Sequence, residues 1–462
     1  MAIDPHIFRA YDIRGKAYTQ LTAEACWWIA TAFGSVVREK YAAETKTPTV
    51  VVGHDARTHS PEFLEEVVSG LMAAGCSVKR IGQTPSPLNY FTVCNRGFDA
   101  GIQITASHNP KEDNGLKLHL RGAEAYAGED LQTLRQRIEA KQVLSGTGAA
   151  EDVEAVMTYM EYLEQLFPAA GARRHVVVDG GNGVAGPTYA MGLKRIKAKV
   201  TGIYLQPDGT FPNHPADPSK YATLADLQAK VLETGADCGF AFDGDGDRLG
   251  VIDEKGQIVT ADQIILLLAK DHLSRNPGAP VVFTVSNSGL LESEITKWGG
   301  RPVMCKVGHS FVEHAMRDNN AQLGGEQSGH FFCGEGYYGF DDALVAAMRV
   351  LSILGANKKA KLSELIAEFP PVFQAHELRP HCDDAKKKEI VAKISEYFAA
   401  KYPVNTLDGA RVDFGDGAWA GIRYSNTSPC LSVCIEARSP EKLKAVEAEV
   451  LGHLGTYAEV QL

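Results

Sequence analysis

Residues 243–247 read Asp-Gly-Asp-Gly-Asp and stand between two short apolar segments. In a strand-like segment, side chains at positions i, i+2 and i+4 project to one side. The glycines between them remove side-chain bulk and permit unusual dihedral angles. Three carboxylates gathered in this way repel each other, and they form the all-oxygen, strongly negative site that a hard dication prefers. We therefore expect Asp243, Asp245 and Asp247 to hold Mg²⁺.

Two other interpretations of this acidic segment are weaker. An EF-hand loop would place Glu254 at its twelfth position, but Arg248 stands where such a loop needs glycine, and the flanks are strand-like rather than helical. An acidic turn exposed to solvent would leave three neighbouring carboxylates without a counter-charge. Metal binding is the preferred interpretation.

The second candidate is Ser107, which follows an apolar run at 101–104 and precedes the turn-forming pair Asn109-Pro110. The sequence around it lacks the G-x-S-x-G pattern of a serine hydrolase. An unassisted serine is a poor nucleophile, yet beside a divalent cation it can carry a phosphoryl group, and Lys117 would add a further positive charge. On its own this segment is typical of a surface loop. Combined with the acidic segment, it predicts a surface-facing loop on which Ser107 can hold a phosphoryl group.

A third polar segment runs from Arg423 to Pro429 and reads Arg-Tyr-Ser-Asn-Thr-Ser-Pro. The guanidinium of Arg423 offers a planar fork of donors, and hydroxyls, an amide and successive backbone N–H groups can surround an oxyanion. The alternative is a polar hairpin turn that binds no ligand. Both interpretations of this segment stay open when it is taken alone.

Residues 181–186 follow a predicted strand and match the G-x-G-x-x-G pattern of dinucleotide-binding turns. The next predicted strand ends near Leu205 and Gln206, where no acidic residue is available to hold a ribose, and Asp208 falls in a predicted turn. We interpret these glycines as a tight strand-to-helix turn.

The elements that must position these segments repeat three times. A β-branched strand is followed by a turn rich in Gly, Ser or Asn, a helix and a second strand, beginning near residues 49, 175 and 280. Short apolar strands that alternate with helices indicate mixed or parallel sheets covered on both faces, and hence three related α/β domains. From Lys386 to Leu454 the pattern changes to a helix, several strands and a helix, which predicts a smaller α+β domain. The predicted domains are 1–153, 154–255, 256–370 and 371–462.

The chain of 462 residues has a formal net charge of −10 and is 44% hydrophobic. It can therefore hold several cores, but it lacks the broad basic surface typical of nucleic-acid-binding proteins. Its first residues do not resemble a signal peptide, and its longest apolar stretch, 264–269, is too short to span a bilayer. The nine cysteines include no C-x-x-C pair and are expected to be reduced, buried thiols. We expect a cytoplasmic protein whose partners are small molecules rather than a nucleic acid or a membrane.

Six short segments, taken in order, resemble the α-D-phosphohexomutase family and specifically its phosphomannomutase/phosphoglucomutase branch. They are Phe8–Gly15, Thr105–Pro110, Asp243–Arg248, Lys306–His309, Gly325–His330 and Arg423–Pro429. Together they extend over nearly the whole chain, and six matches in order are specific where each alone is weak. The resemblance implies four domains around a central cleft, of which the first three are related α/β domains with mixed sheets and the last is α+β.

The resemblance also implies roles for individual residues. Ser107 would be phosphorylated beside Mg²⁺, which Ser107 and the three aspartates would hold. Sugar contacts would come from Glu326 and Ser328. The phosphate that is not transferred would be bound by Arg423, Ser425, Asn426 and Thr427. The residues implied in catalysis are Ser107, His108, Lys117, Arg248, His309 and His330, and those implied in other substrate contacts are Tyr11, Arg14, Gly308, His309 and His330.

An enzyme of this branch interconverts hexose 1-phosphate and hexose 6-phosphate in two transfers. The phosphoryl group of Ser107 would pass to the free hydroxyl of the sugar phosphate, the bound 1,6-bisphosphate would turn over, and its other phosphoryl group would return to Ser107. Glucose 1,6-bisphosphate would thus be both intermediate and activator. A general base and a general acid are required, and Lys117 and the nearby histidines are candidates that the sequence does not rank. The sequence also leaves open glucose against mannose, and monomer against dimer.

Two positions depart from the family pattern, although neither removes a predicted metal ligand. Ser286 stands in a segment where many relatives carry lysine, and Ser428 stands where glutamate is common. The close alternative is phosphoglucosamine mutase, whose corresponding loops usually read Gly-Thr-Asp-Gly and Ser-Gly-Thr-Glu, unlike residues 10–12 and 425–427 here. An inactive sugar-phosphate-binding relative and a phosphatase-like hydrolase are alternatives from other classes.

Overall fold

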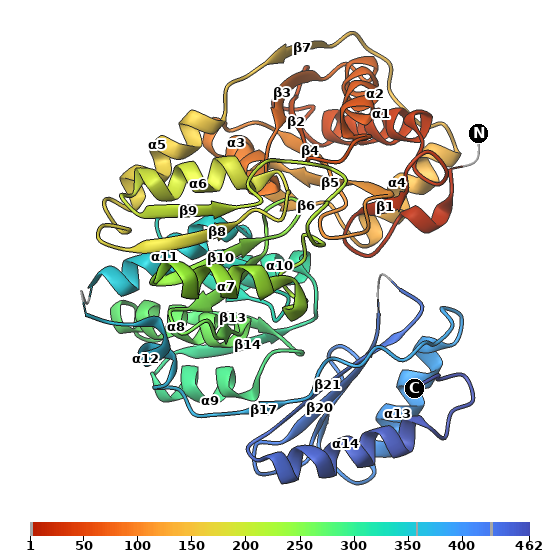
Figure 1. Cartoon of the computed structure of the whole chain (residues 1–462). Helices are drawn as coiled ribbons and strands as arrows, with labels where there is room; N and C mark the ends of the chain where they lie inside the picture. Colours follow the sequence, from red (N-terminus) through yellow and green to blue (C-terminus); the bar gives the residue numbers. More distant parts are fainter. Residues whose placement is uncertain (1–2, 357–358, 426–427) are drawn as a thin grey trace. The chain divides into compact units, whose positions relative to one another are not determined.

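The computed structural model describes residues 3–356, 359–425 and 428–462, and Figure 1 shows its helices and strands. The chain forms two compact units. The first is made of Met1–Ile264 and Ser328–Glu364, and the second of Ile265–Gln327 and Leu365–Leu462. No helix within the described ranges is both long enough and apolar enough to cross a membrane.

The first unit begins with a mixed seven-stranded sheet in the order β1-β5-β4-β2-β3-β7, with β6 paired to β5. Strands β2, β3 and β4 are parallel, whereas β5 is antiparallel to β1 and β4. Val50 and Val52 join the core beneath α1 and α2, and Val51 is buried on the opposite face. The bounds are β1 (Ile13–Lys16), β2 (Thr49–His54), β3 (Ser77–Gln83), β4 (Ala100–Ile104), β5 (Asp113–Leu120), β6 (Glu124–Ala125), β7 (Ala149–Asp152), α1 (Ala23–Lys40), α2 (Ser60–Ala73), α3 (Ser86–Arg96) and α4 (Glu129–Glu139).

A five-stranded sheet in the order β12-β11-β10-β8-β9 follows in the same unit. Strand β8 is parallel to β9 and β10, while β10 and β11 form an antiparallel pair joined by the acidic segment. Residues 181–186 lead from β8 into α6, so they form the predicted strand-to-helix turn. The bounds are β8 (His175–Asp179), β9 (Lys199–Ile203), β10 (Cys238–Phe242), β11 (Leu249–Asp253), β12 (Ile258–Val259), α5 (Val156–Leu166), α6 (Ala185–Arg195) and α7 (Ala225–Thr234). Strand β16 (Phe331–Cys333) and helix α11 (Ala343–Ala356) complete the unit.

The second unit contains the third strand–helix–strand copy and the C-terminal sheet. Strand β13 is parallel to both β14 and β15, so all three predicted repeats are present as parallel strand pairs. The C-terminal sheet has the order β17-β21-β20-β19-β18, and its neighbouring strands are antiparallel. The bounds are β13 (Pro280–Thr284), β14 (Arg301–Cys305), β15 (Leu323–Gly325), β17 (Phe373–Gln374), β18 (Val404–Asn405), β19 (Ala410–Asp413), β20 (Trp419–Tyr424), β21 (Leu431–Ala437), α9 (Gly289–Lys297), α10 (His309–Asn319), α13 (Lys387–Ala399) and α14 (Pro440–Leu454). Helices α8 (Ala261–Arg275) and α12 (Leu362–Ile366) lie where the chain passes between the two units.

The C-terminal domain is α+β, as predicted. Apolar residues of α13 and α14, among them Ile394 and Val450, share one core with the inward residues of β19, β20 and β21, and Figure 1 shows both helices in blue beside that sheet. Helix α14 starts at an N-cap, Ser439, whose hydroxyl accepts a hydrogen bond from the backbone N–H of Lys442. The fold class is therefore confirmed, while the exact domain boundaries and the central cleft stay predictions.

Candidate active site

Ser107 lies against the acidic segment although 136 residues separate it from Asp243. Its hydroxyl donates a hydrogen bond of 2.6 Å to Asp243 Oδ2. The expectation of a surface-facing loop is wrong, because Ser107 is only 1% exposed. Its φ of 50° is in the left-handed region, which costs a residue other than glycine on the order of 1 kcal/mol. The surrounding structure must therefore hold this conformation.

The acidic segment forms the turn between β10 and β11 rather than a strand. The predicted strand-like alternation is therefore wrong, and the carboxylates converge by another route. Asp243 Oδ1 accepts hydrogen bonds from the backbone N–H groups of Gly246, Asp247 and Arg248, at 3.0, 3.1 and 3.2 Å. The turn thus wraps around its own first carboxylate. One oxygen from each aspartate lies within 4.8 Å of the others, and all three side chains are buried.

Close backbone packing allows this turn to reach Ser107. A Cβ atom at Gly244 would lie 2.4 Å from the backbone oxygen of Ser107, which is shorter than any tolerable contact. Glycine is therefore required by the approach of the two loops. On its other side the turn is held by the glycine-rich connection before α6, where the N–H of Val184 donates to the oxygen of Gly244 at 3.1 Å.

Lys117 partly balances the three carboxylates. Its Nζ donates to Asp245 Oδ2 at 2.7 Å and to Asp247 Oδ2. Burial works against a charged ammonium, but the two aspartates hold the pKa of Lys117 well above its ordinary value. Burial, followed by the charges of Asp247 and Asp245, raises the pKa of Asp243 well above its ordinary value. One lysine does not neutralise three buried carboxylates, and the first aspartate resists ionisation.

This donor set fits a hard dication. Within the described residues, Asp245 Oδ1 is buried and has no hydrogen-bond partner, although its other oxygen accepts from both Lys117 and Ser86. Buried carboxylate oxygens are rarely left unpaired. Mg²⁺ prefers carboxylate and hydroxyl oxygens, and the Ser107 hydroxyl is in contact with the same cluster. The geometry therefore suits the predicted ligands Ser107, Asp243, Asp245 and Asp247.

His108 and Arg14 flank the serine. His108 Nδ1 lies 3.1 Å from Ser107 Oγ. Burial, together with the charges of Arg248 and Arg14, holds the pKa of His108 well below its ordinary value, so the ring is neutral and can take up a proton. Arg14 pairs with Asp12 at 2.7 Å and reaches the oxygen of Ala106 at 3.3 Å. The predicted residue Tyr11 is half-buried in the segment before β1.

Arg248, Ser328 and His330 lie together in the same unit. Arg248 Nε is 3.4 Å from His330 Nε2, and Ser328 Oγ is 2.9 Å from His330 Nδ1. His330 Nε2 also lies 3.4 Å from Asp247 Oδ1 and 3.9 Å from Asp341 Oδ2. Burial, and then the charge of Asp247, raises the pKa of Asp341 to about 7. The sequence analysis did not identify Asp341 as a site residue, because an Asp-Asp pair before a helix is typical of an N-cap.

In the second unit, Glu326 organises the turn that starts α10. Its Oε1 accepts a hydrogen bond of 2.7 Å from the N–H of Gly308, and its side chain is 3% exposed. Gly308 has a φ of 137° and precedes the helix, whose first residue His309 is half-buried. The structure therefore brings three predicted residues, Gly308, His309 and Glu326, into one place.

Three cationic side chains lie in or near the C-terminal polar segment, and they come from different parts of the chain. Arg423 lies at the end of β20, and its Nε is buried without a hydrogen-bond partner in the described part of the chain. Ser425 is buried, and its backbone oxygen accepts a hydrogen bond of 2.6 Å from Lys387 Nζ. Arg379 Nη2 lies 3.4 Å from Ser425 Oγ. Sequence analysis missed Lys387 and Arg379, which approach from other segments. The predicted residues Asn426 and Thr427 lie outside the described residues.

A long loop at 206–217 packs on the turn before α6. Asn182 anchors it, since its side chain donates to the oxygen of Gln206 at 2.9 Å and accepts from Asn213 at 2.7 Å. His214 Nε2 lies 3.1 Å from Asp179 Oδ2. The hydrogen bond to Asp179 raises the pKa of His214 above its ordinary value, against the effect of burial.

His214→Gln should destabilise the protein more at low pH than at high pH. A raised pKa in the folded state means that the contribution of the pair is fully present below the unfolded pKa of about 6.5 and is lost as pH rises through the higher folded value. Denaturant unfolding of both proteins across this range measures the difference. His175→Gln is the control, because burial lowers the pKa of His175 and the pH trend should have the opposite sign. A pH-independent loss in His214→Gln would contradict the prediction.

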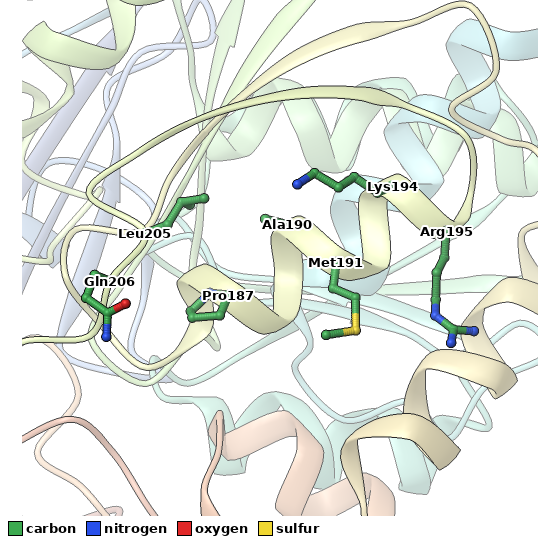
Figure 2. A pocket seen from close by; sticks show the side chains of 7 residues that line it. All are labelled: Pro187, Ala190, Met191, Lys194, Arg195, Leu205 and Gln206. Atoms are coloured by element: carbon green, nitrogen blue, oxygen red, sulfur yellow. The ribbon is translucent and has the colours of Figure 1, made fainter.

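A cavity of about 590 Å³ lies elsewhere in the first unit, along α6 and the end of β9. Figure 2 shows Lys194 on the helix extending toward Leu205, while Met191 and Arg195 extend from the same helix away from Leu205 and Gln206. None of its lining residues belongs to the predicted site. We therefore do not place the chemistry in this cavity, because the buried carboxylates and the serine lie in another part of the unit.

Comparison with family models covers nearly all of the chain. Residues 5–144, 157–256 and 260–373 match the models described as phosphoglucomutase/phosphomannomutase alpha/beta/alpha domains I, II and III. Residues 377–453 match the C-terminal domain of the same series.

Full-length relatives agree with the domain models. A phosphomannomutase/phosphoglucomutase of Pseudomonas aeruginosa is 40% identical over 442 residues, covering 96% of this chain and 94% of that protein. A phosphoglucomutase of Neisseria gonorrhoeae is 35% identical over 457 residues, covering 96% of each. The crystal structure of a phosphoglucomutase/phosphomannomutase family protein from Burkholderia thailandensis superposes with a TM-score of 0.90 at 35% identity and covers 100% of both chains.

Proposed function

Because this chain belongs to the phosphoglucomutase/phosphomannomutase family, we propose that it is an isomerase that interconverts hexose 1-phosphate and hexose 6-phosphate through a phosphorylated Ser107. One observation carries the proposal. The Ser107 hydroxyl lies 2.6 Å from the buried tri-aspartate cluster. A serine in that position can carry a phosphoryl group whose charge is neutralised in place.

The residues around Ser107 have separable roles in two transfers. The phosphoryl group leaves Ser107 Oγ for the free hydroxyl of the bound hexose phosphate, and that hydroxyl must lose a proton as the bond forms. His108 is neutral, and its Nδ1 lies 3.1 Å from Ser107 Oγ, so it can accept the serine proton when Ser107 Oγ takes up the second phosphoryl group. Lys117 and His330 are further candidates for proton transfer. Mg²⁺ held by Ser107, Asp243, Asp245 and Asp247 would neutralise phosphoryl oxygens and polarise phosphorus.

The hexose 1,6-bisphosphate formed by the first transfer must turn over before the second. We assign the phosphate that is not being transferred to Arg423, Ser425, Asn426 and Thr427, assisted by Lys387 and Arg379. Glu326 and Ser328 would contact ring hydroxyls, with Tyr11, Arg14, Gly308 and His309 as further substrate contacts. A phosphate clamp separate from the reacting serine accepts either end of the bisphosphate in turn.

The observations favour glucose and mannose phosphates over glucosamine phosphate as substrates. The relatives at 35–40% identity carry the names phosphomannomutase/phosphoglucomutase or phosphoglucomutase, and phosphoglucosamine mutase is not favoured. Glucose 1,6-bisphosphate is the proposed intermediate and activator. The cytoplasmic location and the choice between monomer and dimer stay predictions.

A coupled assay tests this function. Glucose 1-phosphate, mannose 1-phosphate and glucosamine 6-phosphate would be supplied separately, each with and without glucose 1,6-bisphosphate and Mg²⁺. We expect turnover of at least one of the first two, dependent on both additions. Release of free phosphate faster than isomerisation would instead identify a hydrolase, and turnover of glucosamine phosphate alone would identify the rival mutase.

Arg423→Ala should raise KM for hexose phosphates by roughly 10- to 100-fold, because a charge-assisted hydrogen bond contributes about 1.5–3 kcal/mol. The affinity for Mg²⁺ should not change, because Arg423 belongs to the C-terminal sheet, whereas the proposed metal ligands belong to the first unit. Arg411→Ala is not a suitable control, because Arg411 bonds the backbone of Asn287. Arg438, the residue directly after β21, offers a half-buried arginine of the same domain for comparison. Unchanged KM in Arg423→Ala would show that the clamp is misplaced.

A further inference from the structure

Arg57 is completely buried beneath the loop that carries Ser107. Its side chain has no exposed surface and pairs with Asp55 at 3.1 Å. The other hydrogen bonds of its side chain go to backbone oxygens of residues 107–113: Ser107 at 2.8 Å, Asn109 at 2.7 Å, Pro110 at 2.6 Å and Asp113 at 2.8 Å. A guanidinium has five N–H donors. The bond to Asp55 and these four account for all five.

The same carboxylate reaches Ser107 from the other side. Asp55 Oδ2 accepts a hydrogen bond of 2.7 Å from the hydroxyl of Thr105. Thr105 Oγ1 in turn accepts one of 2.8 Å from the backbone N–H of Ser107. The backbone oxygen of Ser107 is thus held by Arg57, and its backbone N–H is held by Thr105. Both connections start at Asp55, which is 1% exposed.

This closed network, made of Asp55, Arg57 and Thr105, explains why Ser107 keeps an unfavourable backbone conformation. A φ of 50° at a serine is not selected by local preference. With both of its backbone groups fixed, the direction of its Cα–Cβ bond is also fixed, and from there the hydroxyl reaches Asp243. Among the described residues, Arg57 makes no hydrogen bond or ion pair with any of the three aspartates, so its effect on the site passes through the serine loop.

The loop at 206–217 packs against this network. A Cβ atom at Gly209 would lie 2.4 Å from the oxygen of Ala56 and 2.8 Å from Cα of Arg57, so only glycine permits this approach. The ring of Phe211 lies 5.5 Å from the guanidinium. Charge-assisted hydrogen bonds are stronger where water is excluded.

We propose that Arg57 is a positioning residue for the reaction, which fixes the orientation of the phosphorylated Ser107 relative to the acidic cluster without touching substrate. This inference rests on the proposed function of Ser107. It differs from a general role in stability, because the donors of Arg57 converge on the one loop whose geometry the transfer requires. Lysine cannot replace it, since an ammonium has three donors and lacks the planar fork.

The test is Arg57→Lys, compared with Arg174→Lys. Arg174 is a second buried arginine of the same unit, which bonds Asp237 at 3.2 Å and the backbone oxygen of Ala360 at 3.1 Å, away from Ser107. We expect kcat of Arg57→Lys to fall by roughly 100-fold, as small displacements of reacting groups do, with KM for hexose phosphate changed by less than about threefold. The ³¹P resonance of the phosphoserine should move toward that of free phosphoserine. In Arg174→Lys, kcat and the resonance should stay as in the wild type.

Three results would overturn the proposal: wild-type kcat in Arg57→Lys, an unchanged phosphoserine resonance, or an equal loss of kcat in Arg174→Lys at matched unfolding temperature. If Arg57→Lys does not fold, Thr105→Val tests the network from the amide side, and wild-type kcat with an unchanged resonance there would count against it. Absence of mutase turnover in the wild type would instead refute the proposed function, so the two failures are distinguishable.

Discussion

Ser107→Ala should lose at least ~10⁴-fold in kcat while remaining folded, because no other group can take over a covalent intermediate. The hydroxyl is buried but small, and its removal leaves Asp243 Oδ1 bonded to three N–H groups of its own turn. The acidic turn should therefore keep its shape. The coupled assay gives kcat, and intact-mass analysis should find the mass of one phosphoryl group on the active wild type and none on the variant.

Ser35→Ala is the matched control for this change. Ser35 is another buried serine of the first unit, whose hydroxyl donates to the oxygen of Thr31 at 2.7 Å within α1. It should lose some stability and keep both turnover and the phosphoryl group. Ser107→Ala with activity within tenfold of the wild type would end the phosphoserine mechanism.

Asp245→Asn should reduce kcat by at least ~100-fold and abolish stabilisation by Mg²⁺. The amide has the shape of the carboxylate, so its single oxygen can still accept from Lys117 and Ser86, but one of three negative charges is lost. In the wild type, saturating Mg²⁺ should raise the free energy of unfolding by about 2.7 kcal/mol at one hundred times Kd. Thermal unfolding with EDTA and with Mg²⁺ measures both proteins.

Asp253→Asn serves as the control for loss of a buried carboxylate. Asp253 ends β11 and accepts hydrogen bonds from the N–H groups of Lys255 and Gln257 at 2.9 and 2.8 Å. This variant should be less stable than the wild type and should respond to Mg²⁺ to the same extent. If Asp245→Asn were stabilised as strongly as Asp253→Asn, the acidic cluster would not be the magnesium site.

The parts of the site that were predictable from sequence are those in which the reaction or the metal requires particular residue types. Three alternating aspartates, a serine before Asn-Pro and a nearby lysine signal their roles by identity and spacing, and the structure brings them together. The three α/β repeats were predictable because buried parallel strands need apolar, β-branched runs, as at 50–52.

What the sequence did not reveal depends on contacts between distant segments. Arg57 stands in an ordinary turn two residues after Asp55, and its four partners are backbone oxygens, which leave no mark on residue type. The burial of Ser107 arises because the turn at 243–247 packs onto it, which local pattern does not foresee. The convergence of the aspartates likewise comes from N–H groups that wrap around Asp243 rather than from strand periodicity.

The packing of Gly244 on the oxygen of Ser107 constrains how this protein can diverge. Two peptide segments touch there with no side chain between them to absorb a change. An insertion or substitution in either segment is felt directly by the other, so the pair can vary only in concert. Sequence drift in this lineage is accordingly expected to accumulate elsewhere, because any side chain at position 244 would displace Ser107.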